Sequence, residues 1–82
     1  MEIGKVIHFY DKISVAVVEL MKPLHVSDRV VFRGHTTEFE QEVGSLQIDH
    51  QNLEMADIGQ QVAIKVEDRV RCGDKVLAPE GD

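Results

Sequence analysis

The sequence contains a single cysteine, Cys72, so no disulfide can form within the chain. Small proteins of oxidising compartments usually depend on several disulfides, which makes a reducing compartment the expected setting. The chain also lacks any apolar run near the roughly 20 residues that span a bilayer. Residues 1–5 lack the charged and then apolar order of a signal peptide. We therefore expect a cytoplasmic protein that does not enter a membrane.

Basic residues are scarce, with 9 Lys and Arg against 15 Asp and Glu, and the formal net charge is −6. Overall charge therefore does not attract this protein to phosphate backbones or anionic membranes. Any contact with a nucleic acid has to come from a local group of basic side chains.

Residues that carry chemistry are scattered. The four histidines, His8, His25, His35 and His50, are separated by 17, 10 and 15 residues, which matches no compact metal-binding pattern. Asp49 and His50 are adjacent, but neighbouring residues of a strand point to opposite faces, which is a poor arrangement for a base and its orienting carboxylate. We expect a non-catalytic protein without a metal or another cofactor.

Alternating and β-branched residues dominate, and helical periodicity is weak. At residues 36–43, one face carries Thr37, Phe39, Gln41 and Val43, while glutamates fill most of the other. Strands are predicted at residues 3–9, 13–20, 29–33, 37–48, 61–67 and 75–78. One helical turn is expected near Met55 and Ala56.

The long strand at residues 37–48 contains a break in its alternation. After Val43 the next apolar residues are Leu46 and Ile48, three and five positions on. An extra residue at Gly44 or Ser45 restores the register, so the sequence predicts a β-bulge or a sharp bend there.

Two segments, 24–31 and 70–77, place a small residue and an aspartate directly before a short β run. The pairs are Ser27-Asp28 and Gly73-Asp74. Aspartate hydrogen-bonds the backbone just ahead of it, and the small residue eases the reversal, so each pair predicts a turn that starts a strand.

These patterns predict an all-β fold. At 82 residues the chain is expected to form one domain, residues 1–82. We expect a closed or nearly closed, six-stranded, mainly antiparallel β-barrel. Its interior is expected to contain Val15, Val17, Phe39, Leu46, Ile48, Val62, Ile64 and Val76.

Four motifs follow one another along the chain: Leu24-x-Val26-Ser27-Asp28-x-Val30, Val43-x-Ser45-Leu46-x-Ile48, Ala56-x-x-Gly59-x-x-Val62-x-Ile64 and Val70-x-x-Gly73-Asp74-x-Val76-Leu77-Ala78-Pro79. Together they resemble the domain II β-barrel of elongation factor Tu and other translational GTPases, and in particular the small translation elongation factor-like proteins. The sequences of those small proteins also look like the C-terminal barrel of some peptidase-family RNA-modifying proteins. The resemblance covers residues 4–79.

The sequence departs from the elongation factors in two respects. Residues 11–17 lack the glycines of the matching strand entry in those factors. The 82 residues contain no Gly-x-x-x-x-Gly-Lys-Ser/Thr loop and are too few to include a nucleotide domain, so we do not expect a GTPase.

The resemblance implies contact with RNA, a tRNA or an rRNA, or with the translation apparatus. The candidate contact residues are basic or aromatic, since cations bind phosphates and rings stack on bases. They are Lys65, Arg69, Arg71 and Arg33, with Tyr10 or Phe9 as a stacking surface.

A second hypothesis assigns the chain to protein–protein interaction. The strand predicted at residues 13–20, from Ile13 to Leu20, is apolar on both faces, which is typical of an interface. The chain would then be a subunit that supplies a barrel in trans to a peptidase-like RNA-modifying enzyme.

Overall fold

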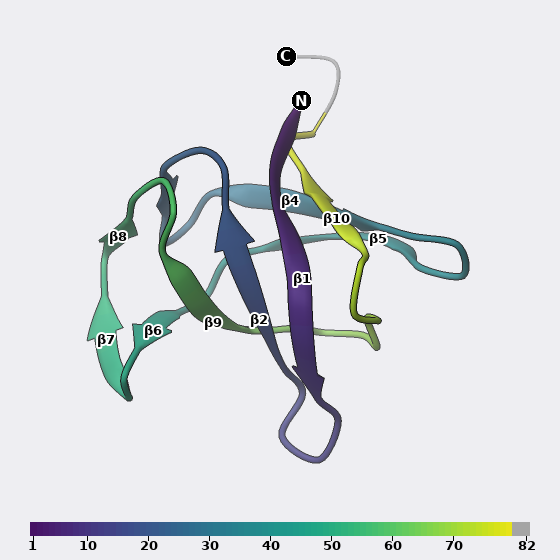
Figure 1. Cartoon of the computed structure of the whole chain (residues 1–82), viewed down its shortest axis with the longest axis horizontal. Helices are drawn as coiled ribbons and strands as arrows, with labels where there is room; N and C mark the ends of the chain where they lie inside the picture. The colour runs from purple at the N-terminus through teal and green to yellow at the C-terminus, as the bar shows by residue number, and fades with distance from the viewer. Residues whose placement is uncertain (80–82) are drawn as a thin grey trace.

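The computed structural model describes residues 1–79, in which all regular structure is β (Figure 1). The strands are β1 (Glu2–Tyr10), β2 (Val15–Leu20), β3 (Leu24–His25), β4 (Arg29–Arg33), β5 (Glu38–Glu42), β6 (Leu46–Ile48), β7 (Gln51–Leu53), β8 (Met55–Ala56), β9 (Gln61–Lys65) and β10 (Lys75–Leu77). The all-β prediction is confirmed. Residues 1–79 contain no helix long and apolar enough to cross a membrane.

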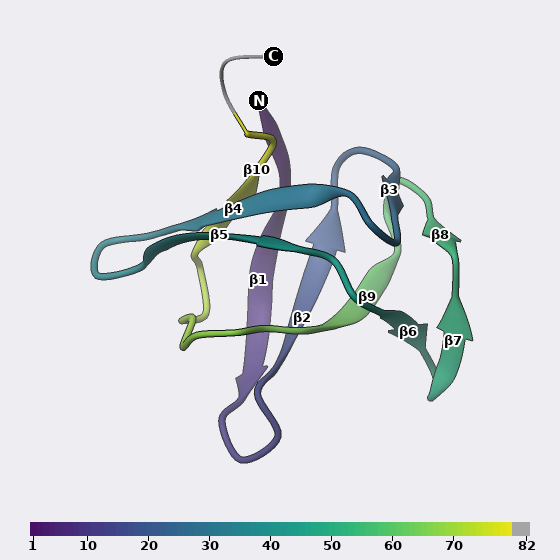
Figure 2. The ribbon, with the colours of Figure 1, turned by 180° about the vertical axis from the view of Figure 1, so that it is seen from behind.

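Eight of these strands form one antiparallel sheet in the order β5-β4-β10-β1-β2-β9-β6-β7, and β3 pairs with β8 separately. The sheet curls, so that the β4–β5 hairpin crosses over β1 and β2 when seen from behind (Figure 2). Its two end strands, β5 and β7, do not pair with each other, and the sheet is open. The prediction of a closed six-stranded barrel is therefore wrong.

The expected strand at residues 37–48 is divided, which explains part of this difference. β5 ends at Glu42 and β6 begins at Leu46, so the predicted interruption at Gly44 and Ser45 is confirmed. Beyond it the chain pairs at the far end of the sheet, with β9 and β7. Gly44 is not among the positive-φ glycines of residues 1–79, and the bend does not depend on a left-handed glycine.

The expected helical turn at Met55 and Ala56 is also wrong. These residues form β8, in which Ala56 pairs with Leu24 of β3. Ala56 is buried while Met55 is exposed, because the two-stranded sheet presents one face to the core.

Much of the predicted interior is confirmed. Four of the eight expected core residues are fully buried and two pack against the core from partly buried positions. The fully buried residues are Leu46, Val62, Ile64 and Val76, and the partly buried ones are Phe39 and Ile48.

The predicted orientation of β2 is reversed. Ala16, Val18 and Leu20 are buried, whereas Val15 and Val17 lie on the outer face and are only partly buried. Both faces of this strand are apolar, so alternation alone could not choose between them. The choice is made by register, since Val18 lies opposite the buried residues Val6 of β1 and Val62 of β9.

The first predicted turn is present at residues 25–28. The Asp28 amide donates to the His25 carbonyl at 3.2 Å, and Ser27 has a φ of 81°. This geometry is that of a type II turn, whose third residue needs a positive φ. The Asp28 carboxylate accepts a hydrogen bond from the His25 amide at 3.0 Å, which is the predicted role of the aspartate.

The second predicted turn, at residues 71–74, repeats this arrangement. Gly73 has a φ of 97°, and the Asp74 carboxylate accepts a hydrogen bond from the Arg71 amide at 2.8 Å. Asp74 is buried against Gly34, where any side chain would collide with the carboxylate. The turn thereby joins the start of β10 to the β4–β5 hairpin.

The side chain of Gln41 connects β5 to the end of β9, two segments that do not pair with each other as strands. Its buried side-chain amide donates to the Lys65 carbonyl at 3.0 Å and accepts from the Glu67 amide at 2.8 Å. A residue of a neighbouring parallel strand, paired with Val66, would make the same two hydrogen bonds with its own backbone N–H and C=O groups. A side chain on the end strand β5 thus holds the end of β9 across the open side of the sheet.

We predict that Gln41→Met will destabilise the protein by about 2 kcal/mol, because it leaves two backbone groups without partners. The melting temperature should fall by roughly 10 °C, as expected for a domain of this size. Thermal denaturation followed by circular dichroism measures the change. Gln61→Met, at an exposed position of β9, is the matched control and should melt close to wild type. Equal melting temperatures for the two variants would contradict the bridging role.

Candidate functional site

The outer face of β2 and its neighbours forms a groove of about 500 Å³, which we call the β2 groove. Val15 and Val17 contribute the apolar floor from β2, and Ala63 extends it on β9. Val17 lies directly opposite Ala63, which in turn lies opposite Gln47 of β6. Antiparallel register therefore places residues from three strands side by side on one surface.

Two large side chains stand at the end of this groove nearest the β1–β2 turn. Ile13 is 60% exposed and Tyr10 is 49% exposed. Tyr10 packs edge-on against His8, with ring centroids 4.3 Å apart. A contiguous apolar surface with a polar rim is typical of a protein-binding site. Three of its residues, Ile13, Val15 and Val17, belong to the segment 13–20 that the sequence assigns to a protein interface.

The turn between β6 and β7 forms part of the rim. Asp49 and His50 both take left-handed conformations, with φ of 51° and 63°, and both line the groove. Asp and His tolerate this region better than most residues, although each does so at a cost. Positive φ at both residues is the regular geometry of a two-residue type I′ hairpin turn, and this turn places Asp49 and His50 at the rim of the groove.

The basic residues proposed for RNA contact lie on different parts of the surface. Arg69 and Arg71 line the same small hollow, beside the β4–β5 hairpin. Asp68 and Glu38 line that hollow as well, so its charge is mixed.

The other candidates lie elsewhere. Lys65 is at the end of β9, opposite Val15 and beside the β2 groove. Arg33 is on the outer face of β4, and Tyr10 is in the β2 groove. Phe9 packs against the core and is only partly buried. The structure therefore does not gather the proposed residues into one rim, and RNA contact stays a prediction.

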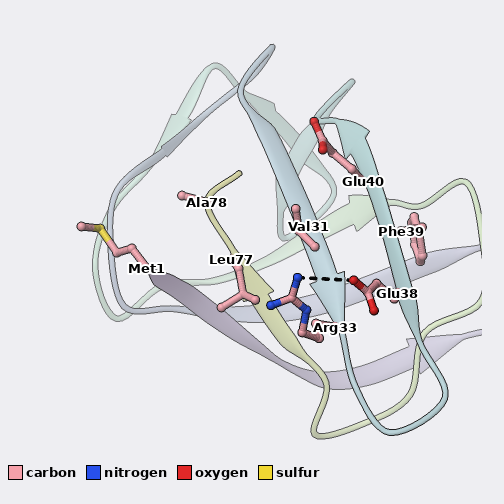
Figure 3. A pocket seen from close by; sticks show the side chains of 8 residues that line it. All are labelled: Met1, Val31, Arg33, Glu38, Phe39, Glu40, Leu77 and Ala78. Carbon is pink, nitrogen blue, oxygen red and sulfur yellow. Dashed lines mark hydrogen bonds and ion pairs between the residues drawn. The ribbon is translucent and has the colours of Figure 1, made fainter. Parts of the chain in front are cut away.

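A second hollow, of about 340 Å³, lies over β4 and β10, is lined by both apolar and charged side chains, and is called here the β10 hollow (Figure 3). Val31 and Leu77 face each other across the two strands at its floor. Arg33 lies at one side and contacts Glu38 at 3.4 Å. The sequence carries a single signal for this site, the alternation of Arg29, Val31 and Arg33, and the site was not predicted from it.

Groups that could hold a metal are not gathered. Within residues 1–79, no three His, Cys, Asp or Glu side chains lie close enough to form a metal site. His25 lies 3.7 Å from Asp28 in the first turn, and both side chains are exposed.

Comparisons with known proteins give three sequence relatives, of which two are collagenases from strains of one organism. The chain is 43% identical over 77 residues to an uncharacterised protease of Methanocaldococcus jannaschii, and 34% identical over 76 residues to a collagenase of Porphyromonas gingivalis. These matches cover 93% and 90% of this chain but only 19% and 21% of the relatives. The chain thus spans about a fifth of the length of each. No family model matches it.

Comparison with solved structures identifies the fold. The C-terminal domain of a Geobacillus thermoleovorans protein assigned to the U32 peptidases superposes with a TM-score of 0.90. The match covers 96% of this chain and 92% of that domain, at 20% sequence identity. A second structure of that domain, a selenomethionine variant, gives a TM-score of 0.89 at 21% identity. The chain has the fold of this domain.

These findings correct the resemblance to elongation factor Tu and the small translation elongation factor-like proteins. The relatives found are proteases and a U32 peptidase domain, not translation factors. The motifs that carried the resemblance are turn residues and core aliphatics, which a β-barrel-like fold requires whatever its function. The likeness to the C-terminal barrel of peptidase-family proteins agrees better with the comparisons.

We predict that the double substitution Asp49→Asn/His50→Gly will stabilise the protein by about 1 kcal/mol, because Asn-Gly adopts this two-residue turn with less strain. Urea denaturation measures the change. The control is Asp11→Asn/Lys12→Gly in the β1–β2 turn, where neither residue has a positive φ, and no gain is expected. A destabilised Asn-Gly variant would show that the two side chains support the fold instead.

Proposed function

We propose that this chain is a non-catalytic docking domain that acts with a peptidase-like catalytic protein. The observation that carries the proposal is the match of nearly the whole chain to about a fifth of two much longer proteins, a protease and a collagenase. A unit that recurs as a small part of larger enzymes, and shares its fold with a peptidase C-terminal domain, is suited to a supporting role beside a catalytic region.

The β2 groove is the surface proposed for this contact. A standard interface covers roughly 800 Å² on each partner, which is about 15% of the 5321 Å² surface of this chain. The groove, with exposed Ile13 and Tyr10 at its end, offers an apolar centre for such an area. The polar groups of Gln47, Asp49 and His50 form a rim around it.

The catalytic residues are proposed to lie in the partner. Asp49 and His50 are adjacent, but both take left-handed conformations in the two-residue turn at the rim of the groove, which is not the geometry of a base held by an orienting carboxylate. Action without a cofactor and a cytoplasmic location remain predictions from the sequence.

The experiment uses the Methanocaldococcus jannaschii relative as the probe. A form of that protein without its matching 77-residue region is titrated with this chain by isothermal calorimetry. We predict binding with a micromolar or tighter Kd, and at least tenfold weaker binding for Val17→Lys, which places a charge at the centre of the groove. Thr36→Lys, at an exposed position outside the groove, should bind like wild type.

A second arm covers the case in which the shortened relative does not fold. This chain is exchanged for the matching region within the full-length relative, and resistance of the chimaera to limited proteolysis is compared with and without Val17→Lys. Docking predicts a protected chimaera that the substitution exposes. Equal protease sensitivity of both chimaeras, or no binding by a folded shortened relative, would overturn the proposal.

A further inference from the structure

A row of charged side chains crosses the outer face of the sheet at right angles to the strands. In order it contains Glu19 of β2, Lys5 of β1, Lys75 of β10, Arg33 of β4 and Glu38 of β5. Each member lies directly opposite the next in the antiparallel register. Three cations therefore stand together, although they are far apart in the sequence.

This arrangement is unfavourable for folding, because like charges directly opposite each other on a sheet repel. Among residues 1–79, neither Lys5 nor Lys75 forms an ion pair. Arg33 has one contact with Glu38, at 3.4 Å, between side chains that are 48% and 69% exposed. The cations are thus accessible to a ligand.

Arg29, which lies on β4 as Arg33 does, has a close ion-pair partner and differs from Arg33 in this respect. It lies 2.7 Å from Glu40, and this hydrogen bond raises the pKa of the Arg29 guanidinium above its usual value. Among residues 1–79, the three cations of the row, Lys5, Lys75 and Arg33, have no ion-pair partner at so short a distance. Its three cations and two flanking carboxylates leave a net charge of +1, which matches one carboxylate.

The row borders the β10 hollow. Two positions along from Lys75 and Arg33, on the same outer face, lie Leu77 and Val31. Figure 3 shows these two apolar side chains beside Arg33. The cationic pair, Lys75 and Arg33, therefore lies two residues along the strands from the apolar pair, Leu77 and Val31. This spacing is roughly 6.6 Å.

We propose that this face binds an extended peptide segment of a partner protein, in which an acidic residue stands two positions from a bulky apolar residue. Such a segment, running along β10, has the same spacing between alternate side chains as the strand beneath it. Its carboxylate contacts Lys75, Arg33 and Lys5, and its apolar side chain enters the β10 hollow. The site is separate from the β2 groove and does not depend on the function proposed for that groove.

An RNA strand fits this face less well. Glu19 and Glu38 close the row at both ends, and Glu40 and Glu42 continue the negative charge along β5, so a run of phosphates would meet carboxylates. Single-stranded RNA also needs aromatic surfaces on which to stack. The nearby Phe39 is stacked on the buried Phe32 instead, with centroids 5.1 Å apart.

The test is an NMR titration of the isotope-labelled chain with the capped peptide Gly-Ser-Glu-Ser-Leu-Ser-Gly. We expect saturable shifts confined to amides of β1, β4 and β10. Two peptides serve as controls: one has glutamine in place of glutamate, and the other has glutamate and leucine adjacent. Each should bind at least tenfold more weakly. Equal binding of all three peptides, or shifts centred on another face, would overturn the proposal.

Protein variants separate binding from folding. Lys75→Glu should weaken peptide binding at least tenfold while its melting temperature stays equal to or above that of wild type, since the change relieves like-charge repulsion. Lys65→Glu makes the same change of charge on β9 and should leave binding unaltered. If Lys75→Glu unfolds the protein, Lys75→Gln gives the same binding comparison. Loss of binding in Lys65→Glu to the same extent would show a general charge effect and contradict the site.

A titration with an oligouridylate of eight nucleotides tests whether this face binds RNA instead. It should cause no saturable shifts at β4 and β10 at physiological salt. If it binds these residues more tightly than the peptide, and the binding weakens steeply with salt, the face is an RNA site and the peptide proposal is wrong.

Discussion

The open side of the curled sheet depends on one buried amide. Gln41 supplies to Lys65 and Glu67 the two hydrogen bonds that a neighbouring strand would otherwise make. Because a side chain and not a strand makes this connection, β5 can end at Glu42 and the chain can bend away toward β6. The core beneath it, including Val43 and Val66, stays covered without closure of the sheet.

The curled, open sheet also determines which side chains lie on the surface. An 82-residue chain has little interior, and a sheet that wraps around it exposes its whole outer face. On that face, β2 and β9 present aliphatic residues, whereas β1, β10 and β4 present three adjacent cations beside Leu77 and Val31. The two surfaces are built from different strands of one sheet. The β2 groove and the β10 hollow share no lining residue, so the two proposed sites do not overlap.

Local chemistry explains which predictions succeeded. The turns at Asp28 and Asp74 depend on contacts within four residues, so the sequence alone was enough to find them. The interruption near Gly44 was equally accessible, since a change in alternation is a local signal. The family resemblance failed for a related reason, because turn residues and core aliphatics report the requirements of a fold and say little about the reaction or partner that the fold serves.

The sequence by itself determined that the chain is all-β, where its main turns lie, and which face of residues 37–43 is buried. It could not determine which face of β2 turns inward, because both faces are apolar and only pairing with β1 and β9 selects Val18 over Val17. Nor could it show that Lys5, Arg33 and Lys75 are neighbours. Antiparallel register joins residues that are distant along the chain, and only the tertiary structure fixes that register.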